Sequence, residues 1–125
     1  MSENKKKVLM IEDDSFLRKL YRDKLIKEGI DFIEATNGVE GINKIKNENP
    51  DLIILDILLP SKGGFDLLEE KNKEEETKNI PVIVISNLGQ EADVEEGKDL
   101  GVEDYFIKSE ANFTEVVERV KELLQ

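Results

Sequence analysis

The sequence contains neither cysteine nor histidine among its 125 residues. The absence of cysteine excludes a disulfide framework and thiol chemistry. The absence of histidine excludes Ser-His and Cys-His catalysis and every metal site that depends on an imidazole.

Basic residues are also scarce, because 18 lysines and arginines face 29 aspartates and glutamates and leave a net charge of −11. Such a charge repels nucleic acid and anionic membrane surfaces, so we expect no direct nucleic-acid binding. Long apolar runs are missing too, since the first, Val8–Ile11, ends at Glu12 and is too short for a signal peptide or a membrane span. We therefore expect a cytoplasmic protein that does not insert into a membrane.

The length and composition suit one globular domain over residues 1–125, with 38% hydrophobic and 38% charged residues. No repeat period and no low-complexity linker interrupts the chain. We expect a stand-alone domain on this basis.

Five short apolar runs predict strands. The central run, Leu52–Leu55, is apolar at every position, which is typical of a strand buried on both faces in the middle of a parallel sheet. The second run is less hydrophobic and suits an edge position. The five predicted strands are Val8–Ile11, Ile30–Ala35, Leu52–Leu55, Pro81–Ile85 and Asp104–Lys108.

Apolar residues at helical spacing predict a helix after each strand. Asp14 or Ser15 can cap the first helix, and Asn112 or Thr114 the last. The residues expected on the buried faces of the first, second, third and fifth helices are Leu17, Leu20, Tyr21 and Leu25; Val39, Ile42 and Ile45; Phe65, Leu67 and Leu68; and Val116, Val117, Val120, Leu123 and Leu124. Five strands alternating with five helices predict an α/β fold with a doubly wound parallel sheet.

Two helical segments have unusual compositions. The third helix runs into the charged stretch 69–76, which we interpret as a solvated helix face. The fourth, Gly89–Leu100, has Gly97 inside it, and its only apolar anchors are Ala92, Val94 and Leu100. We expect this fourth helix to be the least firmly held.

Polar residues follow four of the predicted strands, namely Glu12 with Asp13, Asp56, Ser86 and Lys108. Parallel strands end at one edge of a sheet, where ligands bind in α/β folds, so these side chains should meet. Carboxylates about 4 Å apart repel by about 4 kcal/mol at an effective dielectric of about 20, so the cluster needs a cation or must retain protons. Oxygen ligands without histidine or cysteine favour Mg²⁺. This combination predicts phosphoryl transfer, with Asp56 as nucleophile and with Ser86 and Lys108 contacting phosphoryl oxygens.

Each residue also has a simpler interpretation. Acids near Glu12 can favour a helix N-terminus, Asp56 and Ser86 can begin turns, and Lys108 can be a solubilising charge. Taken singly, these interpretations are favoured for the acids, Ser86 and Lys108. Only the joint placement of these residues at one edge of the sheet favours a functional site.

Four segments, in order along nearly the whole chain, resemble the receiver domain of two-component response regulators. They are Ile11–Asp14, Ile54–Pro60 with Gly64 beyond it, Val84–Ser86 and Asp104–Lys108. The resemblance implies a flavodoxin-like fold with strand order 2-1-3-4-5. It also implies that Asp56 is the phosphoacceptor, and that Mg²⁺ binds Glu12, Asp13, Asp56 and the backbone carbonyl of Leu58.

The resemblance further implies that Ser86 is the switch hydroxyl, Tyr105 the switch aromatic and Lys108 the lysine that binds the phosphoryl group. The family usually has a proline with a cis peptide bond after this lysine, whereas Ser109 follows here, which favours a trans bond. Leu58 and an equally apolar Leu88 lie where side chains of the family tune hydrolysis of the acyl phosphate, so we expect slow self-dephosphorylation.

The predicted function is therefore that of a signalling phosphoacceptor, not an enzyme in its own right. Its phosphoryl donor would be a partner histidine kinase or a histidine phosphotransfer protein, and its output face would be the fourth helix, fifth strand and fifth helix. The alternative is a pseudo-receiver that is not phosphorylated and acts as an interaction scaffold. An aspartyl-phosphate phosphatase is disfavoured because Leu58 replaces the second aspartate that such enzymes need.

Overall fold

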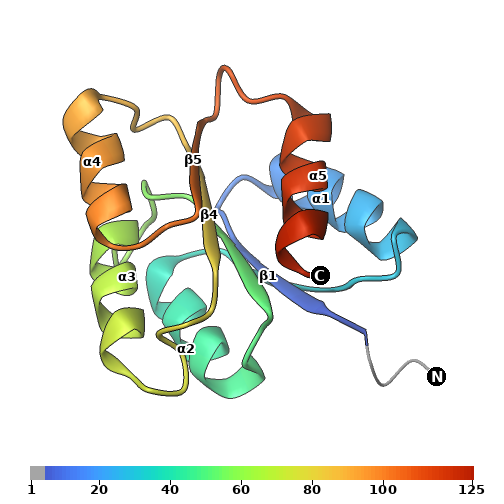
Figure 1. Ribbon diagram of the computed structural model, residues 1–125, viewed down its shortest axis with the longest axis horizontal. Helices are drawn as coiled ribbons and strands as arrows, with labels where there is room; N and C mark the ends of the chain where they lie inside the picture. The colour runs from blue at the N-terminus through green and yellow to red at the C-terminus, as the bar shows by residue number, and fades with distance from the viewer. Residues whose placement is uncertain (1–4) are drawn as a thin grey trace.

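The protein, described here for residues 5–125 by a computed structural model, is built on one five-stranded parallel sheet with strand order β2-β1-β3-β4-β5 (Figure 1). The strands are β1 (Lys7–Ile11), β2 (Asp31–Ala35), β3 (Leu52–Leu55), β4 (Val82–Ser86) and β5 (Asp104–Ile107). The fold class and strand order predicted from the sequence are confirmed, with β3 at the centre and β2 at an edge.

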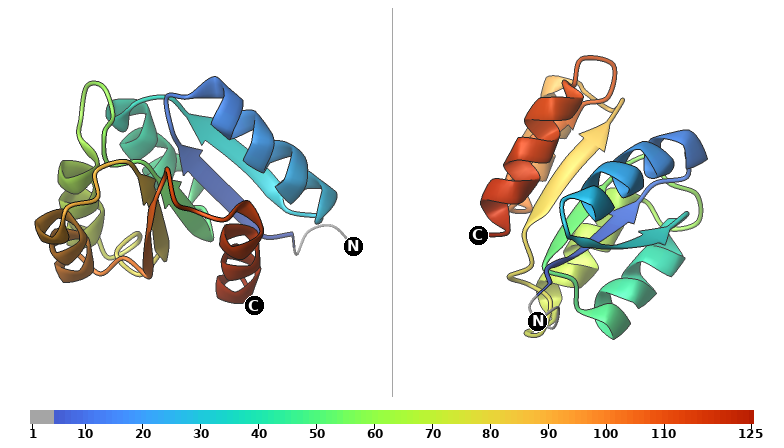
Figure 2. Two further views of the ribbon diagram at one scale, coloured as in Figure 1. Left: turned by 90° about the horizontal axis from the view of Figure 1, so that it is seen from above. Right: turned by 90° about the vertical axis from the view of Figure 1, so that its right-hand side faces the viewer.

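Five helices cover the two faces of the sheet. They are α1 (Ser15–Lys27), α2 (Gly38–Glu48), α3 (Gly64–Lys73), α4 (Glu91–Asp99) and α5 (Phe113–Leu123). Helices α1 and α5 lie on one side and α2, α3 and α4 on the other, as the two views in Figure 2 also show. No helix within residues 5–125 is long and apolar enough to cross a membrane.

Side-chain alternation along the strands supplies both halves of the core. Val8 and Met10 of β1 pack with the residues of α1 and α5, whereas Leu9 and Ile11 pack with those of α2 and α3. All four of these side chains are buried. A strand buried on both faces must be apolar at every position, which is the pattern that predicted the inner strands.

The structure decides between the alternative helix caps. Asp14 caps α1, because its Oδ1 accepts hydrogen bonds from the amides of Phe16 and Leu17 at 2.9 and 3.3 Å. Asn112 caps α5 by accepting from the amide of Glu115 at 3.0 Å. In both helices the side-chain oxygen satisfies amides that have no partner within the helix.

Three apolar residues expected on buried helix faces are exposed instead. Leu20 is 40% and Val39 47% exposed, and Ala92 of α4 is also exposed. In α1 the buried residues are Tyr21 and Leu25, four positions apart, and Leu20 is rotated by about 100° from Tyr21 around the helix. The sequence predicted the helices correctly, but the buried faces of these helices are narrower than predicted.

The interpretation of the charged stretch 69–76 as a solvated helix face is wrong at Lys71. Helix α3 ends at Lys73, and the Lys71 side chain is only 4% exposed. Its ammonium group donates hydrogen bonds to the carbonyl of Lys78 at 2.9 Å and to Asn72 Oδ1 at 3.2 Å. Burial lowers the pKa of Lys71. These bonds make burial of the charge tolerable.

Candidate functional site

Three carboxylates meet at the carboxyl-terminal edge of the sheet. One oxygen of each of Glu12, Asp13 and Asp56 lies within 4.8 Å of the others. The sheet sets this geometry, because hydrogen bonding continues one residue past the strands: the Asp56 amide donates to the Ile11 carbonyl at 3.0 Å, and the Glu12 amide donates to the Ala35 carbonyl at 2.9 Å. The ends of β1 and β3 are therefore held side by side, as the sequence predicted.

Lys108 brings the only ammonium group that contacts this carboxylate cluster within residues 5–125. Its Nζ lies 2.8 Å from Asp56 Oδ2 and 3.0 Å from Glu12 Oε1. Burial opposes the charged form, but the hydrogen bonds with Asp56 and Glu12 outweigh it and raise the pKa of Lys108. The peptide bond between Lys108 and Ser109 is trans, as expected.

Glu12 lies in surroundings that disfavour its charged form. Its side chain is 1% exposed, and burial raises its pKa to about 7, with repulsion from Asp56 adding to the effect. The Asp14 amide, which donates to Glu12 Oε2 at 3.1 Å, and Lys108 lower the pKa but do not restore its ordinary value. Glu12 Oε1 is buried and accepts no hydrogen bond. Its one cationic neighbour among the described residues is the ammonium group of Lys108, 3.0 Å away.

These residues fit a hard divalent cation. Three carboxylates face one ammonium group, two of them (Glu12 and Asp56) are buried, and the donor set consists of oxygen alone. A cation among them would offset the burial and the repulsion from Asp56 that raise the pKa of Glu12. Mg²⁺ prefers this type of ligand.

The remaining predicted residues lie on the loops around the cluster. The Leu58 amide donates to Asp56 Oδ1 at 3.0 Å, while the Leu58 side chain is 52% exposed. Ser86 is fully buried at the end of β4, and its Oγ accepts a hydrogen bond from the Leu88 amide at 3.2 Å. Tyr105 of β5 donates its hydroxyl hydrogen to the Leu88 carbonyl, and burial raises its pKa to about 12.

Sequence reasoning missed the contacts that attach the loop after Asp56 to the start of α2. Ser61 has a positive φ of 67°, which is uncommon for a residue other than glycine. Its Oγ donates to Asn37 Oδ1 at 3.2 Å and accepts from the Val39 amide at 3.2 Å. The Gly38 amide donates to the Pro60 carbonyl at 3.1 Å, and a Cβ at Gly38 would lie 1.7 Å from the Lys62 carbonyl oxygen. Glycine is therefore required at the point where these segments meet.

It also missed Arg18 of α1, whose Nη1 donates to the Glu12 carbonyl at 2.8 Å and whose Nε donates to Glu34 Oε1 at 2.9 Å. The partners are six and sixteen residues away, and no local pattern pairs them.

A hollow of about 430 Å³ lies at the opposite end of the sheet, near Lys71 and Glu103, away from the carboxylate cluster.

Comparison with known proteins identifies similar chains. A family model described as "Response regulator receiver domain" matches residues 8–121. The chemotaxis protein CheY of Thermotoga maritima is 36% identical over 104 residues, which are 82% of this chain and 85% of that protein. Longer relatives described as probable transcriptional regulators are 31–35% identical, and the chain spans only 41–50% of their length.

Solved structures resemble the whole fold. The receiver domain of the Francisella response regulator 1452 superposes with a TM-score of 0.86 at 32% identity, covering 95% of this chain and 96% of that chain. The Mn²⁺-bound form of response regulator Rcp1 gives a TM-score of 0.80 at 28% identity, covering 94% and 91%.

Proposed function

The chain belongs to the response regulator receiver domain family, and we propose that it is a signalling phosphoacceptor, phosphorylated on Asp56 in a reaction that depends on Mg²⁺. The observation that carries this proposal is the meeting of Asp56 with Glu12, Asp13 and Lys108 at one edge of the sheet. Receiver domains interact with histidine kinases and with downstream effectors. The donor proposed here is the phosphohistidine of such a kinase or of a histidine phosphotransfer protein.

The proposed step is a direct transfer. A carboxylate oxygen of Asp56 attacks the phosphorus of the donor, the phosphorus–nitrogen bond breaks, and the imidazole of the donor leaves with the electron pair. The product is an aspartyl phosphate. Lys108, which pairs with Asp56 before the reaction, would bind an oxygen of the transferred phosphoryl group, and the Ser86 hydroxyl would donate a hydrogen bond to another.

Receiver domains bind Mg²⁺ at an acidic pocket, and Glu12, Asp13, Asp56 and the backbone carbonyl of Leu58 would hold it here. When bound, the ion supplies positive charge that offsets the negative charge of the phosphoryl oxygens. The buried Glu12 Oε1, which accepts no hydrogen bond, and the pKa of Glu12, which stays raised despite the ion pair with Lys108, support this assignment.

Output would pass through Ser86 and Tyr105 to the face formed by α4, β5 and α5. Tyr105 is hydrogen-bonded to Leu88, which lies three residues before the start of α4, so a change at Ser86 or Tyr105 can be transmitted to that helix. A hydroxyl that turns toward the phosphoryl group would release the Leu88 amide from Ser86 Oγ. These roles, and the cytoplasmic location, remain predictions.

A direct test exposes the protein to acetyl phosphate with Mg²⁺ and measures phosphorylation by intact mass. The wild type should gain one phosphoryl group and Asp56→Asn none. Asp99→Asn, which removes an exposed carboxylate on α4, is the matched control and should react like the wild type. A wild type that is never modified, and whose spectrum does not respond to beryllofluoride, would favour the scaffold alternative.

The lifetime of the phosphorylated form gives a second test. Leu58 and Leu88 offer no polar group to orient an attacking water, so self-dephosphorylation should be slow. Leu58→Asn should shorten the lifetime, whereas Leu58→Met should preserve it. Decay of the wild-type phosphoprotein within seconds would contradict this expectation.

A further inference from the structure

We propose that Arg18 is a positioning residue: held by Glu34, it fixes the turn that carries Glu12 and Asp13 and thereby sets the affinity of the cation site. This inference rests on the proposed function, since it assumes that these carboxylates bind a divalent cation. No hydrogen bond or ion pair joins the Arg18 side chain to the carboxylate oxygens of Glu12 or Asp13, or to Asp56.

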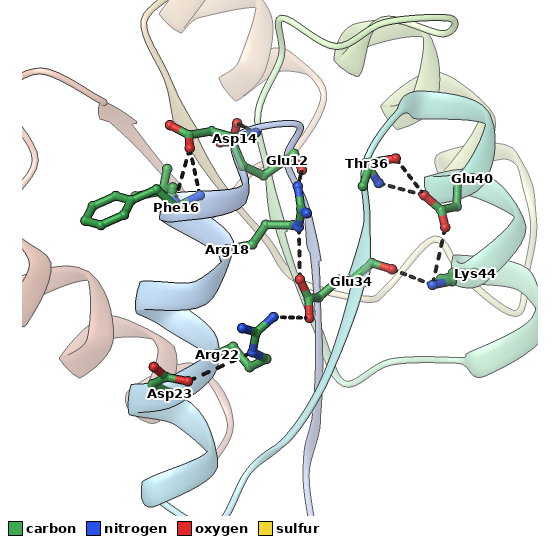
Figure 3. A network of polar contacts seen from close by, with 11 residues as sticks. Glu12, Asp14, Phe16, Arg18, Arg22, Asp23, Glu34, Thr36, Glu40 and Lys44 are labelled. Carbon is green, nitrogen blue, oxygen red and sulfur yellow. Dashed lines mark hydrogen bonds and ion pairs between the residues drawn. The ribbon is translucent and has the colours of Figure 1, made fainter.

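The Arg18 side chain spans two elements of the fold (Figure 3). Its Nη1 donates to the Glu12 carbonyl at 2.8 Å, and its Nε donates to Glu34 Oε1, on β2, at 2.9 Å. The side chain is only 15% exposed. A charged donor forms a stronger hydrogen bond than a neutral one, and partial burial reduces competition from water.

The contact falls where sheet hydrogen bonding ends. The Glu12 amide is still bonded to the Ala35 carbonyl at 2.9 Å, but the Glu12 carbonyl lies beyond the paired residues of β1, and Arg18 supplies its partner. This carbonyl belongs to the peptide group that joins Glu12 to Asp13. Fixing that peptide group fixes the point from which both side chains depart.

Glu34 gives the guanidinium group of Arg18 a firm anchor. Its second oxygen, Oε2, accepts a hydrogen bond from Arg22 Nη1 at 2.8 Å, so two arginines one helical turn apart hold the same carboxylate. Lys44 of α2 also donates to the Glu34 backbone carbonyl. The network ties α1, β2 and α2 together beside the turn.

The positioning effect of Arg18 on cation affinity can be distinguished from the effect of its charge. Arg18 binds a backbone carbonyl, so it leaves the carboxylate oxygens free, whereas Lys108 occupies them. Removing a positive charge near a cation site should strengthen cation binding on electrostatic grounds alone. Loss of the positioning contact should weaken it, so the two effects have opposite signs.

Arg22 provides a matched control. It shares the Glu34 carboxylate with Arg18 and has the same charge. Its hydrogen bond is to Glu34 and it forms a 3.9 Å ion pair with Asp23, whereas the contact with Glu12 belongs to Arg18. Arg18→Met and Arg22→Met therefore remove equal charge, and only the first frees the Glu12 carbonyl.

The experiment measures Mg²⁺ affinity by calorimetry for the wild type, Arg18→Met, Arg18→Lys and Arg22→Met. Arg18→Met should weaken binding about 10-fold, the lower end of the range for residues that support metal ligands. Arg18→Lys keeps the charge but cannot hold both partners with a planar fork, so it should also lose most of the affinity. Arg22→Met should stay within about twofold of the wild type.

A second readout uses the protein without Mg²⁺. Hydrogen exchange at the Asp14 amide, which is bonded to Glu12 Oε2, should be faster in Arg18→Met than in Arg22→Met. If Arg18→Met does not fold, Arg18→Lys supplies the same comparison. Equal or tighter Mg²⁺ binding by the Arg18 variants would overturn the inference. Absence of Mg²⁺ uptake by the wild type would instead overturn the proposed function.

Discussion

Helices α1 and α4 both begin next to the site, but they are held by very different means. Helix α1 buries Tyr21 and Leu25, and its arginines join it to Glu34 of β2. Helix α4 buries only Gly97 among its nine residues. The site therefore has a firmly packed side, which carries the proposed cation ligands Glu12 and Asp13, and a lightly packed side, which follows the switch candidate Ser86.

Helix α4 is attached mainly at its ends. At its start the Gln90 amide donates to Asp93 Oδ2 at 3.0 Å, and at its end Asn72 Nδ2 donates to the Leu100 carbonyl at 2.9 Å. Polar contacts at two ends can be exchanged at lower cost than a buried apolar stripe. The contrast with α1 favours α4 as the element that moves when the site is modified.

The largest expected difference between the two helices is in the free energy of unfolding that is lost when a buried side chain is shortened to alanine. Leu25→Ala in α1 should reduce the free energy of unfolding by about 2–5 kcal/mol, because Leu25 is fully buried. Val94→Ala in α4 should cost less than about 1 kcal/mol, because Val94 is only partly buried. Urea denaturation measures both values. Equal losses would remove the basis of the comparison.

Hydrogen exchange tests the same contrast without mutation. The amides of α4 should exchange through openings that cost at least about 1–2 kcal/mol less than those of α1, since few apolar contacts must be broken to release α4. Exchange under native conditions, analysed residue by residue, gives these free energies. If α4 is as protected as α1, the proposal that α4 is the most displaced element on activation loses its support.

The sequence predicted what local patterns control. The apolar run Leu52–Leu55 placed β3 at the centre, and the abrupt change from apolar to acidic at Glu12 and Asp56 marked the strand ends that meet at the site. Parallel strands bring such ends together whatever the details of packing. The meeting of Glu12, Asp13, Asp56 and Lys108 could be predicted for that reason, while the roles of these residues remain predictions.

The sequence did not predict features that depend on packing between distant segments. Leu20 and Val39 fit the expected apolar stripes but lie outside the buried arc, whose direction is set by the sheet. Lys71 is buried because the carbonyl of Lys78 reaches its ammonium group, which no charge pattern reveals. Arg18 likewise finds its partners only in the folded chain.

A smaller effect is expected at Gly97, where α4 rests on β5. A Cβ added there would lie 2.8 Å from Tyr105 Cδ2, so Gly97→Ala must displace the Tyr105 ring or shift the helix. The gain in helix propensity, about 1 kcal/mol, opposes this strain, so the net change in stability should be below about 1 kcal/mol. The Tyr105 ring resonances should nevertheless move.

Lys98→Ala, at an exposed position of the same helix, is the control for Gly97→Ala and should leave those resonances in place. Unchanged Tyr105 resonances in Gly97→Ala would show that α4 and β5 are not coupled through this contact. The transmission route proposed from Tyr105 to α4 would then have to rely on the hydrogen bond between Tyr105 and Leu88 alone.

The last expected effect concerns Lys71, which bonds the Asn72 side chain that tethers the end of α4. Burial lowers the pKa of Lys71 in the folded state below its unfolded value. Between these two pKa values the unfolded chain binds more protons, so this group makes the free energy of unfolding rise with pH, and below both values its burial cost is constant. Lys71→Met should abolish that rise, which cannot exceed about 1.4 kcal/mol per pH unit for one proton.

Urea titrations of both proteins at several alkaline pH values measure the difference, with Lys73→Met, at an exposed neighbouring position, as the control. Parallel curves for wild type and Lys71→Met would show that the ammonium group of Lys71 is hydrated in solution and not held in the buried position beside Asn72.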